Sequence, residues 1–179
     1  MTDYNEGIRV YLAGPFFDET QRERIAWIEE VLQSYNFDIF SPRKASLIGP
    51  DSTNEDMIRT FDGNISHIDN CDFMLAILDY DGKSSDPGTV FETGYAFSRN
   101  KPILYFNETR EKGPNLMLAM SGKLPFITGT TRTNDLFTFD LDESSNDPRF
   151  NLKKTLEYIK KLGVSNVVKK TKNVFDEVE

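Results

Sequence analysis

Cysteine and histidine each occur once in the 179 residues, as Cys71 and His67. A single cysteine excludes an internal disulfide, and it is typical of a protein kept in the reducing cytoplasm. We expect Cys71 to lie reduced in the core. One cysteine and one histidine cannot supply the nitrogen and sulfur ligands of a usual zinc site, so we expect no metal.

Long apolar runs and clusters of basic residues are also missing. No apolar run approaches the roughly 20 residues that span a bilayer, and the N-terminus lacks the basic-then-apolar order of a secretion signal. The chain has 21 basic and 29 acidic side chains, a net charge of −8. Because contact with a nucleic-acid backbone needs clustered Lys and Arg, we expect a small-molecule substrate, with no nucleic acid and no membrane as partner.

Strand-like and helix-like patterns alternate along the first two thirds of the chain. We expect strands at residues 8–13, 37–40, 73–78 and 102–106. Between them, apolar residues recur at the three- and four-residue steps of helices, and the continuous apolar run at 73–78 is typical of a central parallel strand. The pattern predicts an α/β fold: a single-domain, flavodoxin- or Rossmann-like parallel sheet with helices on both faces. In such sheets ligands bind outside the carboxyl ends of the strands.

The pattern weakens after Gly113. We expect a short helix at 116–120, a possible edge strand at 136–139 and a helix that opens at Asp147-Pro148. We place the domain at residues 1–162 and regard residues 163–179 as a peripheral C-terminal extension that offers a possible partner surface.

The most informative segment reads Asp86-Pro-Gly-Thr-Val-Phe-Glu92-Thr-Gly-Tyr-Ala. A loop with Asp86 and Gly88 runs into an apolar helix that carries Glu92 near its start. Two carboxyl groups that meet in one pocket can divide nucleophilic and acid–base work at the anomeric carbon of a sugar. The positive end of the helix dipole is expected to favour the ionised form of Glu92.

Several segments together resemble the nucleoside 2-deoxyribosyltransferases. They are Val-Tyr11-Leu-Ala-Gly-Pro-Phe-Phe, Phe-Ser-Pro-Arg43, the segment from Asp86 to Ala96, Lys101-Pro-Ile and Pro-Asn115-Leu-Met. They follow the order of that family over roughly residues 8–140. A Gly-Thr-x-x-Glu string alone also occurs in phosphoribohydrolases of the lysine-decarboxylase-like type, so the ordered set carries the resemblance.

The resemblance implies base exchange on a 2′-deoxyribonucleoside, with retention at the anomeric carbon and no cofactor. By position, Glu92 matches the nucleophile, Asp86 the group that protonates the departing base, and Tyr11 the tyrosine that orients the nucleophile. Phe16 matches an aromatic residue of the pocket. Asn115 matches an asparagine that a neighbouring subunit supplies, which implies a homo-oligomer.

Further binding residues lie on the same rim. Gly14 belongs to the first loop, Gly88 to the loop before Glu92, and Arg43 follows the second strand. Asn64 stands where the family usually has a second base-binding aspartate. An amide can hydrogen-bond a base edge but cannot donate a titratable proton, so base preference is the property that this departure affects.

Other interpretations of the same residues stay open. Asp86-Pro-Gly is also an ordinary turn sequence, and Asn115 can simply cap the helix that follows it. A hydrolase of 2′-deoxynucleoside 5′-monophosphates would use the same carboxylate and tyrosine, with Arg43 and Ser84-Ser85 as phosphate contacts. A non-catalytic nucleotide-sensing domain is a third possibility, although a sensor needs no nucleophile.

Overall fold

The structure is a computed structural model, and it describes residues 7–80, 85–108, 115–128, 137–138 and 145–173. Its centre is a five-stranded sheet in the order β2-β1-β3-β4-β5, with every neighbouring pair parallel. The strands are β1 (Arg9–Ala13), β2 (Asp38–Phe40), β3 (Phe73–Ile77), β4 (Ile103–Asn107) and β5 (Phe126–Thr128). This is the flavodoxin-like strand order, so the predicted fold class is confirmed.

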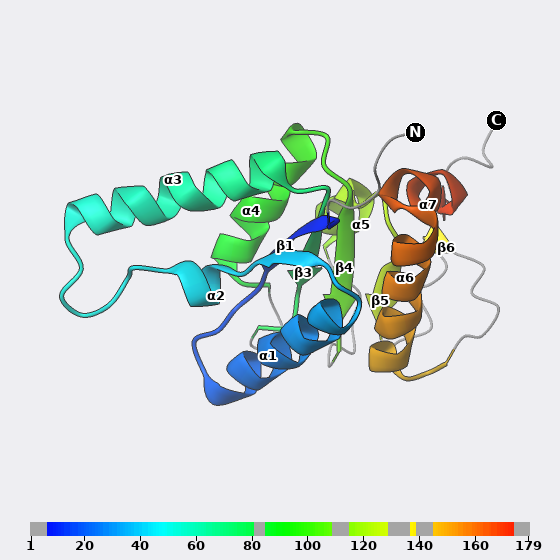
Figure 1. The fold of residues 1–179 in the computed structure, drawn as a ribbon, viewed down its shortest axis with the longest axis horizontal. Coiled ribbons are helices and arrows are strands. Elements are labelled where there is room, and N and C mark those ends of the chain that lie inside the picture. Colours follow the sequence, from blue (N-terminus) through cyan, green and yellow to red (C-terminus); the bar gives the residue numbers. More distant parts are fainter. Residues whose placement is uncertain (1–6, 81–84, 109–114, 129–136, 139–144, 174–179) are drawn as a thin grey trace.

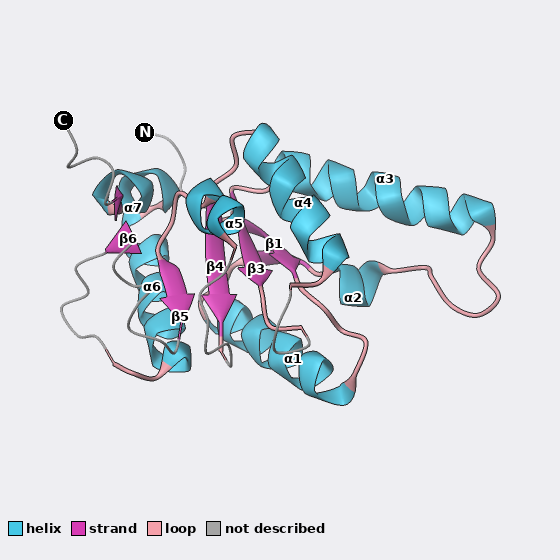
Figure 2. Cartoon of the chain, turned by 180° about the vertical axis from the view of Figure 1, so that it is seen from behind, coloured by secondary structure: helices cyan, strands magenta, loops and turns pink. Residues whose placement is uncertain are grey.

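Helices cover both faces of the sheet (Figures 1 and 2). They are α1 (Glu19–Ser34), α2 (Pro42–Ala45), α3 (Asn54–Asn70), α4 (Pro87–Ser98), α5 (Leu116–Ser121), α6 (Pro148–Leu162) and α7 (Val164–Lys170). Because side chains alternate between the two faces of a strand, the strands contribute residues to one core on each face of the sheet. Leu75 and Leu104 pack with residues of α1 and α6. Met74 and Tyr105 pack with residues of α3 and α4 on the other face.

Side-chain caps explain where the helices begin. Asp18 accepts a hydrogen bond from the backbone N–H of Gln21, whose side chain returns the contact in a capping box at the start of α1. Thr53 and Asp56 form a second capping box on α3. α4 begins with Pro87 directly after its cap, Asp86, because proline fits the first helical position, where no N–H is needed.

Four short elements escaped the sequence prediction: β5, the four-residue helix α2, and α7 and β7 (Lys172–Asn173) in the expected C-terminal extension. Of the edge strand expected at 136–139, Phe137–Thr138 forms β6, which pairs antiparallel with β7 in a separate two-stranded sheet. Residues 136 and 139 lie outside the described residues.

Part of the expected C-terminal extension packs on the domain. α7 contacts α6, and Val167 is fully buried in the core that α1 and α6 share with the sheet. The domain boundary at residue 162 stays a prediction, and residues 174–179 lie outside the described part of the chain. None of the described helices has the length and apolar character needed to cross a bilayer.

Cys71, the residue directly after α3, has a free thiol and is buried in the core, as expected. Burial raises the pKa of this thiol to about 11. The group therefore stays protonated near neutral pH and suits a packing role, because the thiolate is the nucleophilic form.

Candidate active site

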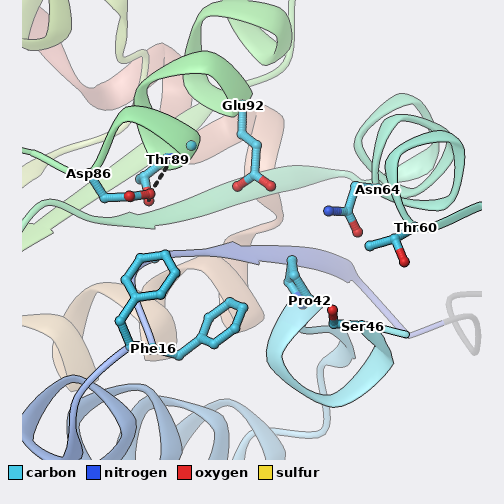
Figure 3. Close-up of a pocket in the computed structure, with 11 residues that line it drawn as sticks. Phe16, Pro42, Ser46, Thr60, Asn64, Asp86, Thr89 and Glu92 are labelled. Carbon is cyan, nitrogen blue, oxygen red and sulfur yellow. Dashed lines mark hydrogen bonds between the residues drawn. The ribbon is translucent and has the colours of Figure 1, made fainter. Parts of the chain in front are cut away.

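A cavity of about 180 Å³ opens beside the carboxyl ends of β1 and β3 (Figure 3). Four segments build it: the loop after β1, the segment around α2, the middle of α3 and the start of α4. The lining residues are Gly14, Phe16, Phe17, Pro42, Ser46, Thr60, Asn64, Asp86, Gly88, Thr89 and Glu92. The structure thus brings six of the sequence-predicted site residues together in one cavity, where ligands bind in this class of sheet.

Glu92 lines this cavity, and Tyr11, which does not line it, contacts Glu92 from the core. Tyr11 is fully buried on β1, and its hydroxyl donates a hydrogen bond of 2.7 Å to Oε1 of Glu92. The carboxylate of Glu92 points from α4 into the space between Asp86 and Asn64 (Figure 3). The Tyr11 hydroxyl thus holds one oxygen of the Glu92 carboxylate, and the carboxylate faces the cavity.

Burial raises the pKa of Glu92 to about 7. The Tyr11 hydrogen bond lowers this pKa and the nearby Asp86 carboxylate raises it, but desolvation is the largest influence. Burial therefore opposes the ionised form that the helix dipole was expected to favour. Glu92 is the sixth residue of α4, beyond the first turn in which the dipole acts.

Asp86 is both the cap of α4 and a wall of the cavity. It is 8% exposed, and its Oδ2 accepts hydrogen bonds from the backbone N–H of Thr89 at 2.7 Å and from the Thr89 hydroxyl at 2.9 Å. Turn and pocket roles therefore coexist at this residue. Gly88 keeps the approach open, because a Cβ there would lie 3.1 Å from Oδ2 of Asp86.

The opposite wall comes from α2 and α3. Asn64 lies across the cavity from Glu92, and Thr60 sits one helical turn before it (Figure 3). Sequence reasoning missed Thr60 and Ser46. The four-residue spacing from Thr60 to Asn64 on a helix was the available signal, whereas Ser46 depends on the path of the chain after α2.

Gly14 is required by the packing beneath the cavity. A Cβ at this position would lie 2.9 Å from the Cβ of Ile77 on β3. A larger residue would therefore push apart the loop after β1 and the neighbouring strand. This close approach sets the position of Phe16 and Phe17, which follow in the same loop.

The model of the nucleoside 2-deoxyribosyltransferase family matches residues 10–147 of the sequence. The chain belongs to this family. It is accordingly an enzyme of the pentosyltransferase class, with nucleosides and bases as substrates. A comparison with curated proteins found no match.

Solved structures with the same fold include a 2-deoxyribosyltransferase from Bacillus psychrosaccharolyticus. It is 28% identical, has a TM-score of 0.59, and the match covers 75% of this chain and 93% of that one. A conserved protein from Enterococcus faecalis V583 is 19% identical with a TM-score of 0.60, over 85% of this chain and 98% of that one. The CMP N-glycosidase BcmB from Clostridium botulinum is 18% identical with a TM-score of 0.53, over 84% and 98%.

Two predicted site residues of this deoxyribosyltransferase-family chain lie away from the cavity. Arg43 faces Glu29, with Nη2 2.5 Å from Oε2 and Nε 3.3 Å from Oε1. Glu29 is only 3% exposed, and a buried carboxylate needs a cation close by, which explains where Arg43 points. Asn115 is exposed and caps α5, its Oδ1 accepting from the N–H of Met117 at 2.9 Å.

Proposed function

We propose that this enzyme exchanges the base of a 2′-deoxyribonucleoside through a covalent ester on Glu92, with retention at C1′. The observation that carries the proposal is that Tyr11 hydrogen-bonds Glu92, which lines one cavity together with Asp86 and Asn64. Retention by two displacements needs an oriented carboxylate on one face of the sugar and an acid near the leaving group.

In the first displacement an oxygen of ionised Glu92 forms a bond to C1′ while the bond from C1′ to the base nitrogen breaks. The electron pair goes to the departing base, and Asp86 supplies the proton that neutralises it. General-acid assistance of this kind contributes roughly 10² to 10⁴-fold to a rate. In the second displacement an incoming base attacks C1′, the ester bond breaks, and the proton of the incoming base returns to Asp86.

Tyr11 has the role of orienting Glu92. Burial raises the pKa of the Tyr11 hydroxyl far above its ordinary range, and the nearby charge of Glu92 raises this pKa further. The phenol therefore remains a hydrogen-bond donor throughout the cycle. It holds one oxygen of Glu92 and leaves the other for C1′.

We assign base recognition to Phe16 and Asn64. Aromatic rings pack on the flat face of a base, and an amide offers both a donor and an acceptor to its edge. Gly14 and Gly88 line the same cavity. The described residues that line the cavity include no Lys or Arg, and Arg43 is engaged by Glu29, which favours a nucleoside over a 5′-monophosphate.

We also propose a homo-oligomer in the cytoplasm, in which Asn115 completes the site of a neighbouring subunit. Its exposure beside exposed Leu116 and Met117, at 64% and 76%, supports this placement. Mixing inactive Glu92→Ala and inactive Asn115→Ala subunits should restore activity, because hybrid assemblies contain some sites with both native residues. No recovery after mixing and reassembly would contradict the shared site.

The proposed reaction is tested with deoxyinosine in the presence and absence of free adenine. Formation of deoxyadenosine that depends on both substrates supports base transfer. Release of hypoxanthine at a rate that ignores adenine would show a hydrolase instead. A Glu92→Ala enzyme with full turnover would exclude Glu92 as the nucleophile and leave a different mechanism or a binding role.

A further inference from the structure

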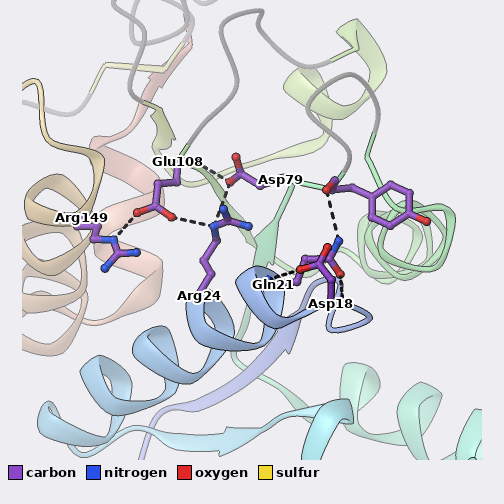
Figure 4. A network of polar contacts seen from close by, with 7 residues as sticks. Asp18, Gln21, Arg24, Asp79, Glu108 and Arg149 are labelled. Atoms are coloured by element: carbon purple, nitrogen blue, oxygen red, sulfur yellow. Dashed lines mark hydrogen bonds and ion pairs between the residues drawn. The ribbon is translucent and has the colours of Figure 1, made fainter.

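Gln21 joins two of the loops that lead to the active site (Figure 4). It lies on α1 and is 5% exposed. Its Oε1 accepts hydrogen bonds from the backbone N–H groups of Phe17 at 2.8 Å and Asp18 at 3.4 Å. Its Nε2 donates at 3.3 Å to the backbone carbonyl of Tyr80. One amide thus holds the loop after β1 with its oxygen and the loop after β3 with its nitrogen.

The two loops that Gln21 joins carry opposite parts of the site. The loop after β1 supplies Phe16 and Phe17, which line the cavity and stack on each other with ring centroids 5.5 Å apart. Tyr80 belongs to the connection from β3 to α4, which ends at Asp86. Phe16 and Phe17 form an aromatic wall of the cavity. The rings of Phe17 and Tyr80 meet edge to face at 6.1 Å, so Tyr80 supports this wall without lining the cavity itself.

Arg24, three residues further along α1, makes ion pairs beside the same two loops. Its Nε lies 2.8 Å from Glu108 Oε2 and 4.0 Å from Asp79 Oδ2. Asp79 Oδ2 also accepts the backbone N–H of Glu108 at 2.6 Å. Arg149 at the start of α6 pairs with Glu108 as well. The ends of β3 and β4 are therefore held together, and Gln21 binds Tyr80, the residue directly after Asp79.

We propose that Gln21 is a positioning residue for base binding, which acts through Phe17 and Tyr80 and touches no substrate itself. The proposal rests on the proposed function, because it takes the aromatic wall to be the base site. The amide has two separable tasks. Its oxygen completes the capping box of α1 and holds the N–H of Phe17, and its nitrogen bridges to Tyr80.

Gln21→Glu separates these tasks. Glutamate serves as well as glutamine at this capping-box position, and a negative charge is favourable at a helix N-terminus, so the cap is kept. The donor to the Tyr80 carbonyl is lost, and a carboxylate oxygen now faces a carbonyl oxygen. Gln33→Glu is the matched control, because Gln33 is exposed on the same helix. Gln21→Met removes both the acceptor and the donor at similar size.

The experiment measures KM and kcat for hypoxanthine release from deoxyinosine, with and without adenine, together with the midpoint of thermal unfolding. We expect Gln21→Glu to unfold at a somewhat lower temperature than Gln33→Glu, because it buries a charge. Measured well below that midpoint, its KM should rise about tenfold and its kcat/KM should fall about 10- to 100-fold relative to Gln33→Glu, since small displacements of a site cost that much. Gln21→Met should show the same rise in KM and also a lower unfolding temperature. A KM unchanged from that of Gln33→Glu in either variant would overturn the proposal.

The two proposals fail in different ways. If adenine does not enter the product, the transferase assignment fails, but the comparison of KM values still tests Gln21. If the wild type releases no base at all, calorimetric titration with deoxyinosine replaces the KM measurement. Binding to Gln21→Glu should then be about tenfold weaker than to Gln33→Glu, and equal affinity would reject the positioning role.

Discussion

Replacing Glu92 by glutamine should stabilise the protein in a pH-dependent way. Desolvation raises the pKa of Glu92 from 4.5 to about 7 in the folded chain. Because this folded-state pKa lies above the unfolded value, the stability linked to the protonated group is present below about pH 4.5. It is lost as the pH rises through about 7. One pKa unit corresponds to 1.36 kcal/mol, so ionised Glu92 costs the folded state about 3 kcal/mol above pH 8.

Glutamine resembles the protonated acid in size and still accepts a hydrogen bond from Tyr11. Urea unfolding of Glu92→Gln and wild type should therefore give similar free energies at pH 5. At pH 9 the variant should be more stable than the wild type by about 3 kcal/mol. Taking the difference between the two proteins cancels the titration of all other groups.

Glu30→Gln provides the control, because Glu30 is exposed on α1, and its difference from the wild type should stay within about 0.5 kcal/mol. The reasoning is refuted if the stability gain of Glu92→Gln is the same at pH 5 and pH 9, or if it shrinks as the pH rises. Either result would mean that Glu92 is solvated and not held in a desolvated pocket.

Three further substitutions test the surroundings of the site. Tyr11→Phe removes a hydrogen bond that lowers the pKa of Glu92, so the acid limb of the kcat/KM profile should move to higher pH and the rate should fall about 10- to 100-fold; an unshifted limb would contradict the contact. Burial alone would raise the pKa of Glu29, but hydrogen bonds, the strongest from Arg43, lower the pKa by more. Glu29→Gln should therefore cost about 1 to 2 kcal/mol in urea unfolding at pH 7, because charged hydrogen bonds are lost, and the cost should shrink as the pH falls; a cost that does not depend on pH would argue against the ion pair. Asn64→Asp places a titratable group opposite Glu92 and should change base preference or the acid limb; identical profiles for every base would remove Asn64 from the site.

The parallel sheet could be predicted because burial on both faces leaves a strong mark on the sequence. Residues 73–77 are all buried in β3, and the apolar run there contains no polar interruption. β5 left no such mark, since its three residues Phe126–Thr128 are too short for a periodic pattern. α2 was missed for the same reason, although Pro42 is suited to the first position of a helix.

The sequence predicts which residues form the site better than it predicts their protonation and their side-chain positions. Asp86 and Glu92 follow one predicted strand and Tyr11 lies on the neighbouring one, so the topology alone brings them to one side of the sheet. The protonation of Glu92 depends on how completely neighbouring segments exclude water, which no local pattern records. The position of Arg43 depends likewise on a carboxylate of α1 that competes for its guanidinium.

Mass spectrometry of the protein after reaction with a 2-fluoro-substituted deoxynucleoside tests the central claim most directly. Such a substrate slows breakdown of the ester, so the account predicts one added fluorosugar per chain, on the peptide that contains Glu92, and no adduct on Glu92→Gln. A sugar attached to a different side chain, or base release without any adduct while the wild type turns over, would contradict a covalent role for Glu92.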